Sequence, residues 1–585
     1  MTAAAPAELT ELEQAIVARM TQPDYGRFEA QLRSSAYCAR PVRLRGSVEV
    51  CDGHGGRRRV WSTDGEPDGV LRKACGNRRE AICGPCSAVY RGDAWQLMAA
   101  GLKGGKGVPE SVIGHPAVLA TLTAPSFGVV HAHLLGSDGQ PLRCRPRRDA
   151  PVCAHGNPLW CSKIHDPDDP CLGEPLCAQC FDYDGAVIWN NLLGELWRRT
   201  MIYLPRKLAK LTGMTQERLH ELVRVSYAKV SEYQRRGLVH QHPVIRLDRR
   251  MPTYRTGEIR PPDKRFTTGL LEQALREAVV DVKARVPDEL GGGEVRWGKQ
   301  LDVEQLSSDE DERRQRASYL AKYSTKSTEQ AGGLLHPITA EEVELVKIRE
   351  HARRYMRAAH KLRKKVIEAI DADKPAESMK RPVPATPVPT TSEEPNGVLL
   401  RVLGAMGTSE RVLIGLHDRT EHVGRIVRRT SGGLVLDDDI AVELADVRAI
   451  TSPPPAAKKR DKRDRRLAQC AHAFGYRGHC VTKSRRFSTT FGQLRQNRVD
   501  HVHEQLRANG TESQRALAAA DANERFTAFE FVGVGHLTTG DAYLAAQAAA
   551  RARENRRLAR DARYDRYSRA RDEECGVPQD QSIVA

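Results

Sequence analysis

The 585-residue chain contains no apolar run near the roughly 18 to 20 residues that a membrane-spanning helix needs. Its first residues, MTAAAPAELTELEQ, lack the basic segment followed by an apolar one that a secretion signal requires. Internal repeats are absent as well. We therefore expect a soluble, cytoplasmic protein without a membrane partner.

Acidic residues are too few to balance the basic ones, since 92 Lys and Arg stand against 75 Asp and Glu and leave a net charge of +17. The surplus is clustered in stretches such as GGRRRV, RCRPRRD, KKRDKRDRR and KSRRFS. Such clusters favour a polyanionic partner. The chain also exceeds the roughly 250 to 300 residues that one hydrophobic core serves, so we expect three or four domains.

Cysteine is scarce outside one part of the chain, because eleven of the 14 cysteines fall between Cys38 and Cys180. Two pairs have the Cys-x-x-Cys spacing. In a large chain without a secretion signal, this pattern indicates metal binding rather than disulfides, although free buried cysteines are the plain alternative.

Two structural zinc sites follow from the spacing of these residues. The stretch CSKIHDPDDPCLGEPLCAQC offers four ligands for a tetrahedral site, with Cys153 and Cys171 as spare candidates. The four are Cys161, His165, Cys177 and Cys180. A second set consists of Cys75, Cys83 and Cys86, whose fourth ligand is either Cys38 or Cys51.

The apolar periodicity predicts helices at about 186–211, 268–286, 308–330 and 339–370, and strands at about 222–248 and 294–304. The Pro-rich segment 371–397 and the basic segment 453–466 are typical of linkers. Between them, residues 398–452 form short β-like pieces with turn signals, which predict a small barrel. Residues 467–585 are expected to form a basic, helical C-terminal region.

Two histidines stand two residues apart in RRGLVHQHPVIRLD, residues 235–248. Side chains alternate along a strand, so His240 and His242 point to one face and Gln241 points to the other. Two imidazoles on one face can hold one cation. A pair of satisfied histidines in a hairpin would read the same way, so the pattern needs support from elsewhere in the chain.

Two other segments give that support. AVLATLTAP, residues 117–125, predicts a strand that carries Thr121 and Thr123 and can lie beside the histidine strand. SYLAKYSTKST, residues 318–328, predicts a helix with two pairs at i and i+4. The pairs are Tyr319 with Tyr323, and Lys322 with Lys326. The lysines could hold a phosphodiester against a tyrosine oxygen.

LATLTAP, HQH and YLAKYSTK, in this order, resemble the three motifs of the HUH endonucleases that start rolling-circle replication. The chain is most similar to the replication initiators of actinobacterial plasmids and integrative conjugative elements. Stretches that carry this closer likeness include CGNRREAICGPCSAVYRGDAW, YAKVSEYQRRGLVHQHPVIRLD, AHAFGYRGHCVTKSRRFSTTFGQLR and GVGHLTTGDAYLA. The likeness spans roughly 75–335 and 467–556.

The resemblance implies an α+β fold with an HUH core: an antiparallel sheet of about five strands with flanking helices, and the two histidines on a central strand. We place this nicking domain at 111–370, with an inserted zinc-binding loop at 144–182, after an N-terminal cysteine-rich segment at 1–110. The segment from 339 to 466, which includes the barrel at 398–452, departs from the expected family pattern and reads as an insertion.

The resemblance also implies the chemistry. His240 and His242, with Glu232 as a third ligand and Gln234 behind it, would hold Mg²⁺ or Mn²⁺ at the scissile phosphate. Tyr323 would attack and keep the DNA 5′ end as a phosphotyrosine, while the free 3′ hydroxyl primes synthesis. Tyr319 would be the alternate nucleophile. Double-stranded origin DNA, single-stranded DNA, a host helicase and a DNA polymerase would be the partners.

Binding of origin DNA needs a surface besides the nicking site, and Lys483, Arg485 and Arg486 in GYRGHCVTKSRRFSTTFGQLR are candidates for contacts to backbone phosphates. Two other functions stay open. A relaxase or single-strand transposase would use the same chemistry, but its tyrosine usually lies near the N-terminus, ahead of the histidines. A zinc-dependent DNA-binding regulator would bind the origin without cutting it.

Overall fold

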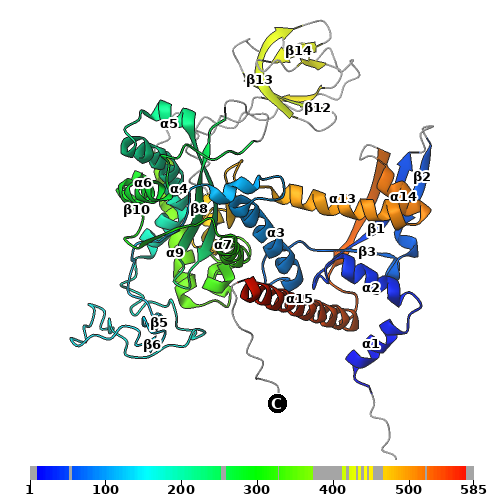
Figure 1. Ribbon diagram of the computed structural model, residues 1–585, viewed down its shortest axis with the longest axis horizontal. Helices are drawn as coiled ribbons and strands as arrows, with labels where there is room; N and C mark the ends of the chain where they lie inside the picture. The colour runs from blue at the N-terminus through cyan, green and yellow to red at the C-terminus, as the bar shows by residue number, and fades with distance from the viewer. Residues whose placement is uncertain are drawn as a thin grey trace, which may run out of the picture. The chain divides into compact units, whose positions relative to one another are not determined.

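The computed structural model describes residues 9–51, 56–251, 258–326, 328–372, 466–520 and 524–574, together with five short strands between 411 and 451. The chain divides into two compact units. One unit comprises Met1–Ala358 and Cys470–Ala585, and the other comprises Ala359–Gln469. Helices and antiparallel sheets are both present, so the α+β class predicted from the sequence is confirmed (Figure 1).

A five-stranded antiparallel sheet lies at the centre of the first unit. Its strand order is β11 (Leu301–Gln305), β4 (Ala117–Leu122), β8 (Val239–Arg249), β7 (Val223–Tyr233) and β17 (Val481–Lys483). The histidine strand β8 is therefore the central strand. The threonine strand β4 pairs with β8, as the sequence predicts.

Helices cover both faces of this sheet. On the face that carries the histidines, α3 (Gly84–Lys103) and α7 (Glu310–Tyr323) pack against buried apolar side chains of β4, β7 and β8, among them Leu119, Val230 and Val244. On the other face, α4 (Tyr183–Leu211) contributes Trp197, whose ring meets Tyr227 of β7. The helix α6 (Thr268–Asp281) packs along α4. Burial on both faces explains why β8 reads as an apolar run.

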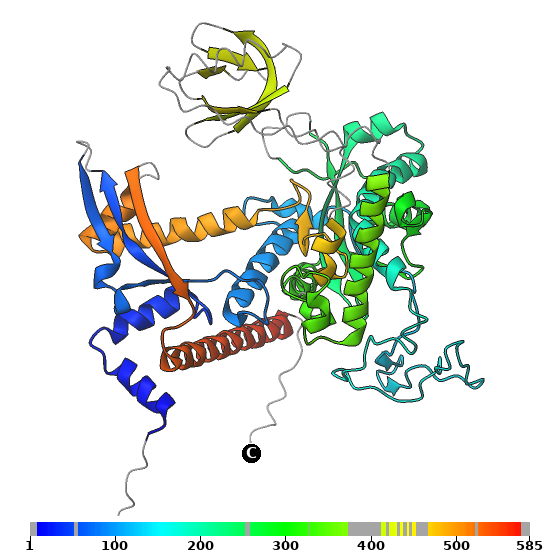
Figure 2. The same cartoon turned by 180° about the vertical axis from the view of Figure 1, so that it is seen from behind.

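A second antiparallel sheet joins the two ends of the sequence. Strands β2 (Arg57–Ser62) and β3 (Leu71–Lys73) pair with β1 (Val42–Cys51), and β18 (Arg525–Val534) pairs with β1 on its other side. Figure 2 shows this C-terminal strand beside the N-terminal ones. At Gly46 the two backbones approach so closely that a Cβ atom would lie 1.9 Å from the carbonyl oxygen of Ala528.

The C-terminal region therefore differs from the helical one that the sequence predicts. It contains α13 (Phe491–Asn509), α14 (Glu512–Ala519) and α15 (Thr539–Glu574), but it also supplies β17 to the central sheet and β18 to the N-terminal sheet. The stretch RFTAFEFVGV has the aromatic and β-branched composition of a strand. Its partner lies almost 500 residues away, so no local pattern reveals the pairing.

The second unit contains β12 (Arg411–Leu416), β13 (Glu421–Arg429), β14 (Gly433–Leu436), β15 (Ala441–Glu443) and β16 (Val447–Thr451), besides the short α12 (Arg466–Gln469). These strands form an antiparallel sheet in the order β15, β14, β13, β12, β16. They fall within the segment 398–452 that the sequence predicts as a small barrel. The predicted linkers at 371–397 and 453–466 lie almost entirely outside the described residues.

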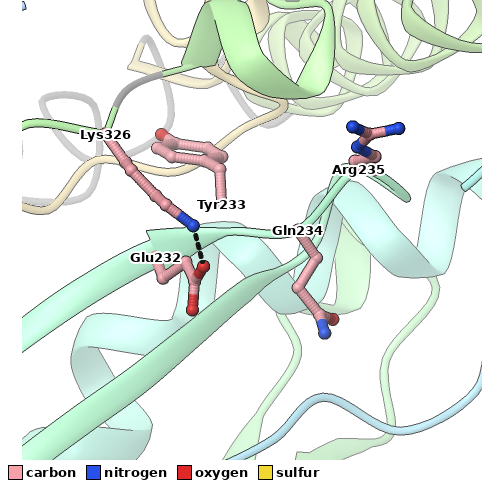
Figure 3. Close-up of a pocket in the computed structure, with 5 residues that line it drawn as sticks. All are labelled: Glu232, Tyr233, Gln234, Arg235 and Lys326. Carbon is pink, nitrogen blue, oxygen red and sulfur yellow. Dashed lines mark hydrogen bonds and ion pairs between the residues drawn. The ribbon is translucent and has the colours of Figure 1, made fainter. Parts of the chain in front are cut away.

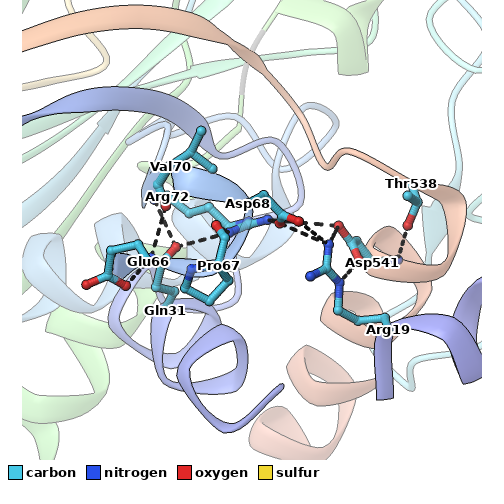
Figure 4. A network of polar contacts seen from close by, with 9 residues as sticks. All are labelled: Arg19, Gln31, Glu66, Pro67, Asp68, Val70, Arg72, Thr538 and Asp541. Carbon is cyan, nitrogen blue, oxygen red and sulfur yellow. Dashed lines mark hydrogen bonds and ion pairs between the residues drawn. The ribbon is translucent and has the colours of Figure 1, made fainter. Parts of the chain in front are cut away.

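A buried ionic network fastens α1 (Glu11–Met20) to α15 (Figure 4). Arg19 donates from Nε to Oδ1 of Asp541 at 2.7 Å and from Nη2 to both carboxylate oxygens of Asp68 at 2.9 Å. Arg72 bonds to Asp68 and lies 4.0 Å from Asp541. The side chains of Arg72 and Asp541 are both fully buried, so each depends on the other members of the network for charge compensation.

Among the described residues, no helix is both long and apolar enough to cross a membrane. The longest one, α15, is rich in arginine.

Replacing Asp541 with Asn should loosen both ends of the chain. The variant leaves two buried guanidinium groups with one carboxylate, and breaking such a pair costs about 3 to 5 kcal/mol. Amide hydrogen exchange should therefore accelerate in α1 and in the first turns of α15. The matched control is Asp561→Asn, an exposed carboxylate on the same helix, which should leave exchange unchanged. Equal exchange in the two variants would contradict this role.

Candidate active site and metal-binding groups

Three predicted ligand residues lie together on the face of the central sheet that α3 and α7 cover. His240 and His242 share this face of β8, with their ring centroids 6.2 Å apart. Glu232 on β7 is paired with His240 in the strand register. Its Oε2 lies 3.0 Å from Nε2 of His242.

A threonine from the neighbouring strand holds His242 from the other side. Oγ1 of Thr121 lies 3.2 Å from Nδ1 of His242. The imidazole is thus fixed at both nitrogens, by a hydroxyl and by a carboxylate. A partner on the nitrogen that does not bind metal is the usual way to orient a ligating histidine, so Nε2, which here meets Glu232, would be the nitrogen that faces a metal ion. The other threonine of the motif, Thr123, instead donates to the carbonyl of Gln300 at 2.6 Å.

The two tyrosines lie at the C-terminal end of α7, directly over His242. The ring of Tyr323 stacks on that of His242, with centroids 4.9 Å apart and planes 12° from parallel. Tyr319, one turn earlier, meets His242 edge-on at 5.7 Å and Tyr323 at 4.9 Å. The spacing of i and i+4 on a helix places both phenols on the histidine side.

One of the two lysines joins this cluster. Nζ of Lys326 lies 2.6 Å from Oε1 of Glu232 and 4.6 Å from the ring centroid of Tyr323. Lys322 is exposed, with Nζ 6.0 Å from the same ring. Lys326 and Glu232 also line a pocket of about 550 Å³ with Tyr233, Gln234 and Arg235 (Figure 3). The charged side chains that line this pocket are those of Lys326, Arg235 and Glu232.

Burial shifts the protonation of the cluster. Burial, with the charges of Arg236 and His242, lowers the pKa of His240 from its ordinary 6.5 to about 3. Burial raises the pKa of Tyr323, and Tyr319 and Glu232 raise it further. Burial alone would raise the pKa of Glu232, but hydrogen bonds with His242 and Lys326 outweigh it and leave the pKa below its ordinary value. At neutral pH the site therefore offers a neutral His240, a carboxylate and a phenol.

Two imidazoles and a carboxylate, from His240, His242 and Glu232, are side chains of the kind that bind divalent cations. Nε2 of His240 is buried and has no hydrogen-bond partner in the described part of the chain, so its lone pair is available. Among the residues that the structure describes, however, the donor atoms of His240, His242 and Glu232 do not all lie within 4.8 Å of one another. Glu232 is drawn toward Lys326, so a cation held by all three would need small side-chain rotations.

Four cysteines of the N-terminal part have their sulfur atoms within 4.8 Å of one another. They are Cys38, Cys75, Cys83 and Cys86. Sγ of Cys38 lies 3.7 Å from that of Cys83, and Sγ of Cys75 lies 3.6 Å from that of Cys86. Sulfurs on a tetrahedral zinc ion are about 3.8 Å apart, given Zn–S bonds of about 2.3 Å. The group could hold a metal ion such as zinc, and its fourth member is Cys38; Cys51 lies outside it.

The loop between these thiols reaches the end of the tyrosine helix. Nη1 of Arg78 donates to the carbonyls of Ser324 and Lys326, at 3.5 and 3.3 Å. Nη1 of Arg79 donates to the carbonyl of Leu335 at 3.0 Å. The cysteine group thus anchors Arg78, which holds the backbone just after Tyr323, and Arg79, which holds the backbone at Leu335.

The four residues of the second predicted zinc site do not form one group in the structure. The structure separates Cys161 and His165 from Cys177 and Cys180. The first pair lies with His131 and Cys144, and the second lies with Cys153 and His155. His131 and His155 were not predicted, because the spacing rule used neighbouring Cys and His residues and could not match pairs far apart in the sequence.

Comparison with known proteins decides the family. A family model described as replication initiator protein, pSAM2, matches residues 24–382 and 420–550. The chain belongs to this family of replication initiator proteins. A replication initiator protein of Streptomyces ambofaciens is 32% identical over 558 residues, which cover 93% of this chain and 94% of that protein. No solved structure matches the chain.

The family match includes much of the segment 339–466, which the sequence pattern predicts to be an insertion. The model of the replication initiators covers 339–382 and 420–466, so most of this segment has a counterpart in the family. The unmatched internal part is 383–419.

The three residues predicted to contact DNA phosphates differ in their surroundings. The Nζ of Lys483 donates to the carbonyls of Ser484, Arg485 and Ser488, at 3.3, 3.2 and 2.9 Å. Its three hydrogens are therefore used within its own loop, and burial lowers its pKa. These three bonds hold the loop together, and the predicted contact of Lys483 with DNA stays a prediction. Arg485 is exposed and Arg486 is half-buried.

The neutral state of His240 predicts a pH dependence of stability. Because its pKa is about 3 in the folded protein and about 6.5 when unfolded, the unfolded state binds the extra proton as pH falls below 6.5. Stability is thus complete above 6.5 and declines toward 3, by about 2 kcal/mol at pH 5. Urea unfolding of metal-free His240→Asn should lack this loss, whereas His220→Asn, at an exposed site, should retain it. Parallel pH profiles of wild type and His240→Asn would contradict the assignment.

Proposed function

We propose that this replication initiator is an HUH-type endonuclease that nicks one strand at an origin by tyrosine attack and later rejoins it. The observation that carries the proposal is the stack of Tyr323 on His242, beside His240, Glu232 and Lys326. A tyrosine ring stacked on one of two neighbouring imidazoles suits covalent phosphoryl transfer. Family membership supports a role in replication initiation.

Tyr323 is the proposed nucleophile. Its oxygen attacks phosphorus and loses its proton to water, and the bond from phosphorus to the 3′ oxygen of the preceding nucleotide breaks. That oxygen leaves with the electron pair, takes up a proton and becomes a free 3′ hydroxyl, while the 5′ end stays on the enzyme as a phosphotyrosine. The bond energy is kept, so the reverse reaction can rejoin the strand. A phenol with a pKa near 10 leaves more readily than an alkyl hydroxyl.

The surroundings of Tyr323 oppose its ionisation, since burial raises its pKa. The ammonium group of Lys326 lies 4.6 Å from the centroid of the tyrosine ring, where it would stabilise negative charge on the attacking oxygen and on the phosphate. Lys322 stands on the exposed side of the helix, where it can meet the DNA backbone.

Tyr319 would act as the second nucleophile. Its ring contacts both His242 and Tyr323, so the two phenols share one site. A second cleavage could then proceed while the first tyrosine still holds a DNA end.

His240, His242 and Glu232 would hold Mg²⁺ or Mn²⁺, which when bound would supply Lewis-acid polarisation of the scissile phosphate. Thr121 orients His242 for this role through its hydroxyl. His240 is kept neutral by burial, so its lone pair is available without loss of a proton. Double-stranded origin DNA and a locally single-stranded substrate are the proposed partners, with a host helicase and polymerase acting after the nick.

Replacing Tyr323 with Phe should abolish covalent attachment and leave origin binding intact. The phenyl ring keeps the stack on His242, and only the attacking oxygen is lost. The measurement is the yield of protein–DNA adduct on a denaturing gel after incubation with origin DNA and Mn²⁺. Tyr319→Phe is the matched variant and should retain the first adduct. An unchanged adduct yield in Tyr323→Phe would move the role to another residue.

Replacing His240 with Ala should remove metal-dependent nicking of a supercoiled origin plasmid while the protein still shifts the DNA in a gel. His220→Ala, which changes an exposed histidine outside the cluster, is the control and should nick normally. Nicking that survives in His240→Ala would overturn the ligand assignment. A wild-type protein that shifts the plasmid without nicking it, in Mg²⁺ and in Mn²⁺, would indicate a DNA-binding regulator instead.

A further inference from the structure

The segment between β4 and α4, residues 128–182, has almost no hydrophobic core. Its regular structure is limited to β5 (Leu134–Leu135), β6 (Pro141–Leu142) and isolated bridges such as Arg145 with Cys161. Apart from three cysteines, its buried apolar side chains are Leu172 and Phe181. A segment of this length without a core needs cross-links to hold one conformation.

Two groups of four ligands lie within this segment. The first group, site A, consists of His131, Cys144, Cys161 and His165. The second group, site B, consists of Cys153, His155, Cys177 and Cys180. In each group the four donor atoms all lie within 4.8 Å of one another.

The separations within each group match those on a zinc ion. A sulfur and a nitrogen on one tetrahedral zinc ion are about 3.6 Å apart, from bonds of about 2.3 and 2.0 to 2.1 Å. In site A, Cys161 Sγ lies 3.5 Å from His165 Nε2, and Cys144 Sγ lies 3.9 Å from His131 Nδ1. In site B, His155 Nδ1 lies 3.3 Å from the Sγ of Cys180 and 3.8 Å from that of Cys177.

We propose that residues 128–182 form a binuclear zinc module whose two sites are interleaved along the chain. The ligands come in four successive pairs: 131 with 144, 153 with 155, 161 with 165, and 177 with 180. The first and third pairs make site A, and the second and fourth make site B. Each metal therefore closes a loop that contains ligands of the other, so the two sites support one another.

Neighbouring groups are arranged as they are around protein-bound zinc. Nδ1 of His165 lies 2.8 Å from a carboxylate oxygen of Asp169, which leaves Nε2 for the metal. The thiols accept N–H groups: the backbone N–H of Ala132 donates to Cys144 at 3.2 Å, and the side-chain amide of Asn157 donates to Cys177 at 3.3 Å. Hydrogen bonds of both kinds stabilise metal-bound imidazole and thiolate.

The module is also tied to the proposed nicking site. Asp169, which orients His165, accepts a hydrogen bond on its backbone carbonyl from Nη1 of Arg235 at 3.0 Å. Arg235 lines the pocket beside Glu232 and Lys326. At Gly173 a Cβ atom would lie 2.5 Å from the backbone of Arg235, and the residue has a φ of +84°, so only glycine fits. The metal at site A thus fixes one wall of the pocket.

The two sites differ in exposure. Every ligand of site A except the half-buried His131 is buried, whereas His155 and Cys180 of site B are exposed. A chelator in solution should therefore remove the metal of site B first.

The test is the zinc content of the full-length protein, measured by elemental mass spectrometry after purification in zinc-containing buffer. With the group of Cys38, the wild type should hold three zinc ions, and X-ray absorption should give three sulfurs and one nitrogen per zinc on average. The double variant Cys144→Ser/Cys153→Ser should retain one. A single site built from Cys161, His165, Cys177 and Cys180 would instead give two ions in the wild type and no loss in the double variant, and this result would overturn the proposal.

A control separates ligand loss from general damage. Cys51→Ser removes a thiol that lies outside all three proposed sites, and this variant should keep three zinc ions. The wild-type count and its sulfur-to-nitrogen ratio do not depend on any variant. They decide the proposal even if the double variant folds poorly: two ions in the wild type would overturn it.

Discussion

The stack of Tyr323 on His242 is the contact on which the account of this initiator depends. It requires that a strand and a helix some eighty residues apart place their reactive groups on the same side of one sheet. Strand alternation puts His240 and His242 on the face that α7 covers, and helical spacing turns both tyrosines toward them. Thr121, Glu232 and Lys326 then surround the pair from three other elements.

Much of this site could be predicted from the sequence, because its signals are local. The His-x-His spacing fixes a shared face in any strand, and the tyrosine pair fixes a shared face in any helix. The apolar flanks of the histidines indicate a central strand, and β8 is central. The orphaned Nε2 of His240 and the reach of Arg78 to the end of α7 could not be read in this way, since both depend on how distant segments pack.

The structure differs from the sequence-based predictions mainly where residues far apart in the sequence come together. Cys161 and Cys177 look like members of one site because they are close in the sequence, yet the structure groups Cys161 with His131 and Cys177 with His155. The strand β18 pairs with β1 across almost the whole chain, and the ionic network of Arg19 and Asp541 connects the same two ends. Lys483 illustrates a local effect instead, because its ammonium group donates to three carbonyls that lie one to five residues away in its own loop.

The central claim is that Tyr323 forms the covalent bond to DNA, and peptide mass spectrometry tests it most directly. Wild-type protein trapped on an origin oligonucleotide would be digested with protease and nuclease, and the modified peptide sequenced. The account predicts a nucleotide 5′-phosphate on Tyr323. A nucleotide on a peptide outside α7, or a linkage through the 3′ phosphate, would contradict it.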